Sequence, residues 1–349
     1  MRISRKGFLP LLVFEGAIVF LCALVTVASK PVSYTVTEIG GLSGTKFASV
    51  TDINGSGKIV GSSANHAFLW DHGVVTDLGT LGGNLSVANA VNDLGQVVGE
   101  SNTATGEKHA FLWEQGVMTD LGTAGETSAA HGINNLGQIV GAAFAKNVRG
   151  GAMLWKNGVR QPLGDLGPSG SGSTAMAVSD KAEIVGVSSG FVANLGGVVR
   201  AVVWQGGTIQ EIGTLGGRHS AANALNGKRE VVGWAEMGDQ STDAFLWQGG
   251  RMHDLGKLPG SLAKAGAGSQ AAGINDHGVI VGSSLNSKGE SRAVIWEFGQ
   301  IRDLNDLIPQ ESGIILTAAK AINLQGQIVA EQQLGPEGPT ASFLLTPRP

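Results

Sequence analysis

The sequence has almost no thiol or phenol chemistry: it contains one cysteine and one tyrosine in 349 residues. The cysteine, Cys22, lies in the apolar N-terminal segment, so the rest of the chain has no disulfide, no thiolate nucleophile and no cysteine-based metal site. Charged residues make up only 15% of the chain, and the formal net charge is −4. This balance argues against a phosphate-backbone binder, so we expect no nucleic-acid partner.

Signatures of catalysis are also missing. The chain has no His-Glu-x-x-His, Cys-x-x-Cys, phosphate-loop or dinucleotide-binding motif. Segment 52–57 alternates oxygen-bearing side chains as a calcium loop does, but no distal glutamate follows, and the other repeats lack Asp52. We therefore predict no enzymatic activity, no bound metal and no cofactor.

The N-terminus differs from the rest of the chain. Three basic residues within the first six precede an apolar run over residues 8–28, and small residues follow at Ala28 and Ser29. This order predicts a secretory signal peptide over residues 1–29, and a secreted, extracellular or periplasmic protein. The run is about 21 residues long, close to a membrane span, so an uncleaved membrane anchor is the alternative.

What the sequence does contain is a repeat. A β-branched or Leu residue followed by Asn, with an Ile/Val-Val-Gly triplet five residues later, returns every 38 to 49 residues. Repeats of this length are stacked supersecondary units that bury their apolar faces against one another. The seven copies have the following residues at the Asn position: Asn54, Asn92, Asn134, Ser179, Asn226, Asn275 and Asn323.

Each unit is consistent with four short strands. In the second and third copies these strands cover residues 111–113, 117–121, 129–133 and 138–141, with turns rich in Gly and Asn between them. No window has a sustained 3.6-residue apolar period, so helices are not expected. The fourth copy lacks the turn glycine, with Ala182 in its place, and we expect a looser hairpin there.

Two positions of the unit indicate how the strands pack. The strand before each Asn turn has small residues at alternate positions, which suits strands that crowd together at the centre of a ring. Another strand of each unit ends in a large apolar residue, which we interpret as core packing between neighbouring units rather than a ligand platform. These residues are Trp70, Trp113, Trp155, Trp204, Trp247, Trp296 and Leu345.

The ends of the chain predict a closed ring. Residues 34–40 match the strand that follows the Trp strand in other units, whereas the last unit stops after residues 343–345, one strand short. If the first strand completes the last sheet, residues 30–349 form one all-β domain, a seven-bladed β-propeller of four-stranded antiparallel blades. An open β-solenoid, the alternative, leaves the first strand unexplained.

The Trp strand and the segment after it resemble the HAF repeat of bacterial exported proteins. Residues 66–70 and 109–113 both read His-Ala-Phe-Leu-Trp, and residues 77–83 read Asp-Leu-Gly-Thr-Leu-Gly-Gly. The resemblance covers almost all of residues 34–345 and is looser in the later units. It implies an extracellular location and no defined biochemical role. We expect His66 and His109, which open the motif, to be solvated strand ends.

A variable position marks a candidate binding site. Three residues before each Asn, opposite the small-residue face, the side chains could project toward the central channel. We predict that Asn89, His131, Asn223 and Lys320 form a polar mouth for a small polar or anionic ligand, the alternative being a water-filled channel without specificity. The seven residues at this position are Thr51, Asn89, His131, Met176, Asn223, Ala272 and Lys320.

Trp234 is the second candidate. Its place is taken by Ser, Glu, Ala or Val in the other units, and Glu236 and Asp239 follow it closely. Such a residue is typical of sugar stacking or of contact with a partner protein, with local packing as the alternative.

These observations predict a rigid exported module that binds or scaffolds a protein or a glycan. The alternatives are an extracytoplasmic carbohydrate-active enzyme with its site at the channel mouth, or a structural surface protein. Glycosidases need two carboxyl groups about 5–10 Å apart. The recurring aspartates fall on the strand that we expect to be outermost, which favours binding: Asp77, Asp120, Asp254 and Asp303.

Overall fold

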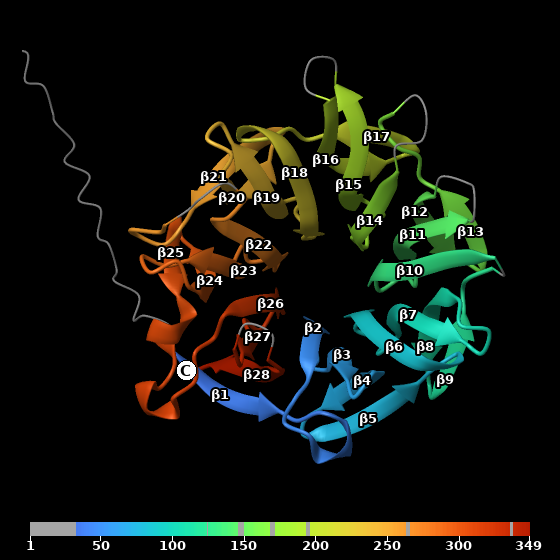
Figure 1. The fold of residues 1–349 in the computed structure, drawn as a ribbon, viewed down its shortest axis with the longest axis horizontal. Coiled ribbons are helices and arrows are strands. Elements are labelled where there is room, and N and C mark those ends of the chain that lie inside the picture. The colour runs from blue at the N-terminus through green and yellow to red at the C-terminus, as the bar shows by residue number, and fades with distance from the viewer. Residues whose placement is uncertain are drawn as a thin grey trace, which may run out of the picture. The chain divides into compact units, whose positions relative to one another are not determined.

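Seven four-stranded antiparallel sheets are arranged like blades around a central axis (Figure 1). The computed structural model describes residues 33–123, 125–145, 150–167, 172–192, 196–262, 266–335 and 338–349. Residues Ser33–Pro349 form one compact unit. This architecture confirms the predicted seven-bladed propeller. The predicted signal peptide or anchor lies outside the described residues, and no helix within them has the length and apolarity needed to span a bilayer.

In blades 1 to 6 the inner strand comes first and the outer strand last along the chain. Blade 1 contains β2 (Ser49–Ile53), β3 (Ile59–Ser63), β4 (His66–Asp71) and β5 (Val74–Gly79), and blade 2 contains β6 (Gly82–Val91), β7 (Val97–Thr103), β8 (Lys108–Glu114) and β9 (Val117–Asp120). Blade 3 contains β10 (Glu126–Ile133), β11 (Ile139–Ala145), β12 (Gly151–Lys156) and β13 (Val159–Pro162), and blade 4 contains β14 (Ser173–Val178), β15 (Ile184–Val192), β16 (Gly196–Gln205) and β17 (Thr208–Glu211).

Blades 5 and 6 follow the same order, and blade 7 takes its outer strand from the N-terminus. Blade 5 contains β18 (Gly216–Leu225), β19 (Val231–Met237), β20 (Thr242–Gln248) and β21 (Arg251–Gly256), and blade 6 contains β22 (Ser269–Ile274), β23 (Ile280–Leu285), β24 (Ser291–Glu297) and β25 (Gln300–Asp303). Blade 7 contains β26 (Ala318–Ile322), β27 (Ile328–Gln333), β28 (Thr340–Pro347) and the N-terminal strand β1 (Tyr34–Ile39). Three short 3-10 helices lie in connections: η1 (Leu42–Gly44), η2 (Leu304–Leu307) and η3 (Gln310–Ser312).

The first and last strands close the ring. Strand β1 pairs with β28 along its whole length, with Val36 opposite Leu345 and Glu38 opposite Phe343. The two strands lie side by side in Figure 1, blue against red. Blade 7 is thereby completed by the N-terminal strand, as the sequence predicts, and the array has no free end at this junction.

The tryptophans pack between neighbouring blades, as expected. Trp204 is 3% exposed and belongs to a cluster that also contains Val140 and Ala152 of the preceding blade. Its indole N–H donates to the carbonyl oxygen of Gly164 at 3.3 Å. Gly164 lies in the segment that leads out of blade 3. The shared clusters remove both apolar faces from water, which a single blade could not do.

Small residues on the inner strands leave room for polar bridges that the sequence did not predict. The Ser86 hydroxyl accepts a bond from the Ala67 N–H of the preceding blade at 2.8 Å and donates to the Gly79 carbonyl at 2.6 Å. Buried backbone groups such as this N–H need a partner. We call these contacts serine bridges; the other four join Ser128 to Ala110, Ser173 to Ala152, Ser220 to Ala201 and Ser269 to Ala244.

The Asn turns form a second ring of bonds around the axis. The Asn54 side-chain oxygen accepts bonds from the N–H groups of Ser56 and Lys58, which holds the turn as predicted. Its amide nitrogen donates to the carbonyl of Asn92 in the next blade at 2.9 Å. The same amide-to-carbonyl bond joins Asn92 to Asn134, Asn134 to Ser179, Asn226 to Asn275, Asn275 to Asn323 and Asn323 to Asn54.

Blade 4 interrupts this Asn ring. Ser179 has no amide to donate to Asn226, and Lys181 instead reaches the Gly227 carbonyl at 2.7 Å. The hairpin itself is not looser, contrary to our expectation. Ser179 and Ala182 make both backbone bonds of the turn at 2.9 Å, and Ala182 adopts a φ of 59° where five other units have glycine and the fifth unit has Arg229. The backbone bonds of the turn hold this conformation in spite of the side chain.

We expect the Ser179→Asn substitution to complete the Asn ring and to raise the free energy of unfolding by about 1 kcal/mol, the usual net value of one hydrogen bond. The matched substitution Asn134→Ser opens a second gap and is expected to lower it by a similar amount. Chemical denaturation of both variants checks this. If Ser179→Asn and the parent were equally stable, the added bond of the Asn ring would make no net contribution to the free energy of unfolding.

Candidate functional site

The variable position on the inner strands is a β-bulge in every blade. In blade 2 the register of β6 against β7 shifts between Ala88 and Ala90, so that Asn89 is the extra residue. The same shift occurs at His131, Asn223 and Lys320, and in the other three blades. A bulge re-aims the side chain of the extra residue and bends the strand. It also explains the recurring glycine opposite it: a methyl group on Gly99 would lie 1.9 Å from the carbonyl oxygen of Val87.

The predicted polar mouth is largely occupied by contacts between blades. The Asn89 amide donates to the Ala130 carbonyl, and the Asn223 amide to the Ala271 carbonyl, both at 2.8 Å and both in the next blade. Lys320 pairs with Glu331 at 2.9 Å. Burial lowers the pKa of His131, which favours the neutral imidazole. Within the described ranges, no hydrogen bond joins any two of the four predicted residues.

Glu331 shows how such contacts extend across the closure. Its Oε1 atom accepts bonds from the Ser49 hydroxyl at 2.8 Å and the Val50 N–H at 3.1 Å, both in blade 1. Its Oε2 atom pairs with Lys320. Glu331 therefore joins blade 7 to blade 1, and Lys320 neutralises the buried carboxylate. This arrangement uses the lysine as a structural partner rather than as a free cation in the channel.

A cavity of about 390 Å³ lies at the end of the channel formed by the Asn turns, with lining residues from all seven blades. Its rim carries Asp93, Asp180 and Asp276, whose carboxylates accept backbone bonds from Gly55, Asn135 and Gly227 at 2.7 to 2.8 Å. The amide of Asn135 also donates to Asp93 at 3.0 Å and to Asp180 at 3.3 Å. The acidic rim is thus a network of capped turns. Among the described residues, no group of three or more His, Cys, Asp or Glu side chains could hold a metal ion.

Asp52, from the segment that resembles a calcium loop, has a structural role in this cavity. Its carboxylate accepts bonds from the N–H groups of Ile53 at 2.8 Å and Val91 at 2.9 Å, and so links blades 1 and 2. Burial raises the pKa of Asp52 to about 6, against the effect of these two bonds. A carboxyl with a raised pKa binds its proton more tightly in the folded state than in the unfolded state.

The contribution of Asp52 to stability is therefore present in full below its ordinary pKa of 3.8 and is lost as the pH rises to about 6. We expect the free energy of unfolding of Asp52→Asn relative to the parent to rise by about 1–2 kcal/mol between pH 4 and pH 7, since access to the channel mouth reduces the full value of the shift. Asparagine keeps only one of the two acceptor oxygens, so the variant also loses one backbone bond at every pH. Urea unfolding at pH 4, 5 and 7 measures this. A difference between the two proteins that does not change with pH would contradict it.

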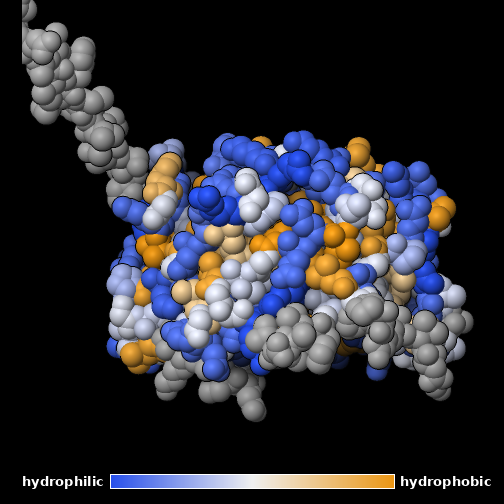
Figure 2. Space-filling view, turned by 90° about the horizontal axis from the view of Figure 1, so that it is seen from above, coloured by the Kyte–Doolittle hydropathy of each residue, from blue (hydrophilic) through white to orange (hydrophobic). Residues whose placement is uncertain are grey.

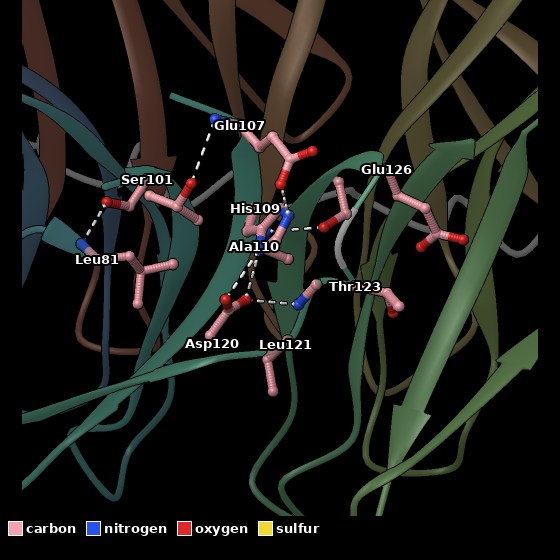
Figure 3. Close-up of polar contacts among 12 residues, drawn as sticks. Leu81, Ser101, Glu107, His109, Ala110, Asp120, Leu121, Thr123 and Glu126 are labelled. Atoms are coloured by element: carbon pink, nitrogen blue, oxygen red, sulfur yellow. Dashed lines mark hydrogen bonds and ion pairs between the residues drawn. The ribbon is translucent and has the colours of Figure 1, made fainter. Parts of the chain in front are cut away.

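The first residue of the His-Ala-Phe motif pairs with the recurring aspartate on the outermost strand. Figure 3 shows His109 of β8 between Asp120 of β9 and Glu107. The Nδ1 atom lies 2.9 Å from Asp120, and the Nε2 atom 3.8 Å from Glu107. His109 is 4% exposed, so our expectation of a solvated strand end is wrong for this residue.

Other blades use the same position with different charges. His66 pairs with Asp77, Arg200 with Glu211, and Arg292 with Asp303. In blade 5 the acid is Asp243 and the cation is Lys257, 2.8 Å away, which lies just beyond β21. In blades 4, 5 and 6 the variation that weakens the motif is therefore a set of alternative ion pairs, whereas Gly151 and Ala341 bring no charge to this position in blades 3 and 7. The aspartates of β5, β9, β21 and β25 do lie on the outermost strands, as predicted.

Trp234 lies in a groove between blades 5 and 6. It sits on β19 between Ala221 of β18 and Ala244 of β20, and is partly exposed. Asp239 caps the following turn by accepting bonds from Ser241 and does not line the groove. The cavity of about 460 Å³ is lined by His219, Trp234, Glu236, Gln240, Thr242, Gly266 and Gln270.

Glu236 is held in this groove by backbone groups. Its Oε2 atom accepts bonds from the N–H groups of Arg218 at 2.7 Å and His219 at 3.0 Å. The ring of His219 in turn accepts a bond from the Val199 N–H at its Nδ1 atom, at 3.2 Å. Of the predicted residues, the structure places Trp234 and its neighbour Glu236 in this cavity. The sequence did not identify the other lining residues, which come from three further strands and two connections.

Comparison with known proteins supports the fold. No family model and no curated protein matches the chain, so the HAF resemblance remains a prediction. The β-propeller domain of the Trilobed protease from Pyrococcus furiosus is similar in structure, with a TM-score of 0.53, 10% identity, and coverage of 86% of this chain and 93% of that one. That domain is described as having an open velcro topology, whereas here β1 completes blade 7.

A second similar structure is the extracellular domain of a protein described as a one component system from B. thetaiotaomicron. The TM-score is 0.53 at 11% identity, and the match covers 89% of this chain but only 39% of that longer one. At these identities the similarity establishes the propeller fold and carries no information on ligand or activity.

Proposed function

We propose that this protein is an exported, non-catalytic binding module that takes its ligand in the groove at Trp234. The observation that carries the proposal is the position of this residue. At the same place on the second strand, Glu100 pairs with Lys108 and Glu331 with Lys320, so those blades fill the site with an internal ion pair. Blade 5 instead presents an aromatic face beside a cavity of about 460 Å³, within the roughly 300–1,000 Å³ usual for small-molecule sites.

The rigidity of the scaffold supports binding rather than catalysis. The closed ring fixes the elements on both sides of the groove, and a preformed site loses little conformational entropy when a ligand binds. The channel, where a catalytic site would be expected, has its polar groups taken up by bonds between blades. Asp93 and Asp180 do share the Asn135 amide, but both are exposed and each accepts a backbone N–H.

Export is the second part of the proposal. It rests on the sequence of residues 1–29, with secretion as the first candidate and membrane attachment through residues 8–28 as the alternative. A protein or a glycan outside the cytoplasm would then be the partner. A purely structural surface role makes no use of the groove, and the binding test below distinguishes it.

The test compares the full-length protein with Trp234→Ala in binding to a glycan array and to soluble extracellular proteins. We expect the substitution to weaken binding at least about tenfold, because a buried aromatic contact is worth about 2 kcal/mol or more at an interface. Its thermal unfolding should shift by only a few degrees, since Trp234 is only partly buried, whereas Trp204→Ala in the core should cost about 3–5 kcal/mol.

Phe298→Ala is the matched control, because Phe298 is 87% exposed and lies on the β24–β25 turn, outside the groove. We expect it to bind like the parent. Unchanged affinity of Trp234→Ala for every ligand that the parent binds would rule out the groove as the binding site.

A further inference from the structure

The chemistry of the groove limits what it can bind. Of the side chains that line it, Glu236 is the only formally charged one, and it is an acid. Arg218, the neighbouring cation, directs its Nη2 atom to the Gly197 carbonyl at 3.4 Å and is not among the lining residues. An anionic ligand would therefore meet a carboxylate without a compensating cation, which disfavours acidic sugars, phosphates and acidic peptides.

The carboxylate is fixed with one oxygen available. Its Oε2 atom is occupied by the N–H groups of Arg218 and His219. No described residue donates to Oε1, which can accept a bond from a ligand. Because the Nδ1 atom of His219 accepts the Val199 N–H, its ring proton resides on Nε2 and can be donated.

Three further side chains that line the groove have polar groups available to a ligand. Within the described residues, the Gln240 and Gln270 amides and the Thr242 hydroxyl make no hydrogen bond, although the same blades pair most of their polar side chains. Each amide offers two donors and an acceptor, and the hydroxyl offers both roles. A site with uncharged groups that can both donate and accept hydrogen bonds suits a ligand edge that carries hydroxyl groups, because each hydroxyl also does both.

Trp234 supplies the complementary apolar surface. It lies in register with two small residues, Ala221 of β18 and Ala244 of β20, and is itself partly exposed beside the cavity. A pyranose has the matching pair of surfaces: a face of C–H groups that packs on an aromatic ring, and an edge of hydroxyl groups. A peptide would use a row of backbone donors and acceptors, but β19 is paired on both sides and offers no free strand edge.

We propose that the Trp234 groove binds an uncharged pyranose, stacked on the indole with its hydroxyl groups bonded to Glu236, Gln240 and Gln270, and that Glu236 excludes acidic sugars. This inference rests on the proposed function of the groove and names its ligand class.

The experiment uses the full-length protein and measures binding of methyl glucoside, galactoside and mannoside, their N-acetylhexosamine counterparts and the matching hexuronic acids by calorimetry. We expect at least one uncharged sugar to bind, and the corresponding uronic acid to bind at least about tenfold more weakly. Trp234→Ala should abolish binding, Trp234→Phe should retain it within about tenfold, and Phe298→Ala should leave it unchanged.

Glu236→Gln isolates the charge, because glutamine keeps an oxygen for the two backbone N–H groups. We expect this variant to narrow the difference between the uncharged sugar and its uronic acid to about threefold or less. A discrimination that stays as large as in the parent would overturn the role of Glu236.

The outcomes separate this inference from the proposed function. Binding of only acidic sugars, or of a protein but no sugar, with loss in Trp234→Ala, would overturn the sugar inference and leave the groove as the binding site. Sugar binding that is equal in the parent and Trp234→Ala would overturn both.

Discussion

Hydrogen bonds from side chains of one blade to the backbone of the next are the contacts on which this propeller depends. The inner strands of neighbouring blades do not pair with one another. A serine bridge joins an inner strand to the third and fourth strands of the preceding blade, as Ser86 does with Ala67 and Gly79, and the Asn ring joins the turns that follow the inner strands. Since an unpaired buried donor or acceptor costs about 1–3 kcal/mol, these bonds decide which residues the inner strands accept.

The need for hydrogen bonds between blades also limits where a repeat can carry a ligand site. The bulges direct Asn89 and Asn223 toward carbonyl groups of the next blade. The side-chain amides of these two residues therefore bond to the neighbouring blade and not to a ligand in the channel. The ligand site that we propose lies where the repeat is broken. Trp234 is such a place: it stands at a position where other blades have internal ion pairs or small residues, and the groove beside it retains uncommitted polar groups.

Charge variation in the repeats has a simple physical basis. The ion pair between the third and fourth strands needs one acid and one cation, and not a particular residue at either place. His109 with Asp120, Arg292 with Asp303 and Asp243 with Lys257 all meet this need. In Figure 2 hydrophilic residues predominate along one rim, while hydrophobic residues show in smaller areas on the flank. Sequence divergence at these sites therefore leaves the blade unchanged.

Patterns along the chain were enough to predict the number of blades, the tryptophan packing and the completion of blade 7 by residues 34–39. These follow from a repeat length, a strand pattern and a count of strands at the two ends, all of which are local properties of the chain. The partners of Asn89 and Asn135, and the seven bulges that re-aim the variable residues, emerge only in the folded ring. It also brought Gln270 of blade 6 to the groove of Trp234 in blade 5. The physical reason is that partners in adjacent blades lie some 40 residues apart or more, as Asn89 and Ala130 do. The packing of whole sheets aligns these partners, and a local pattern of residues carries no information about that packing.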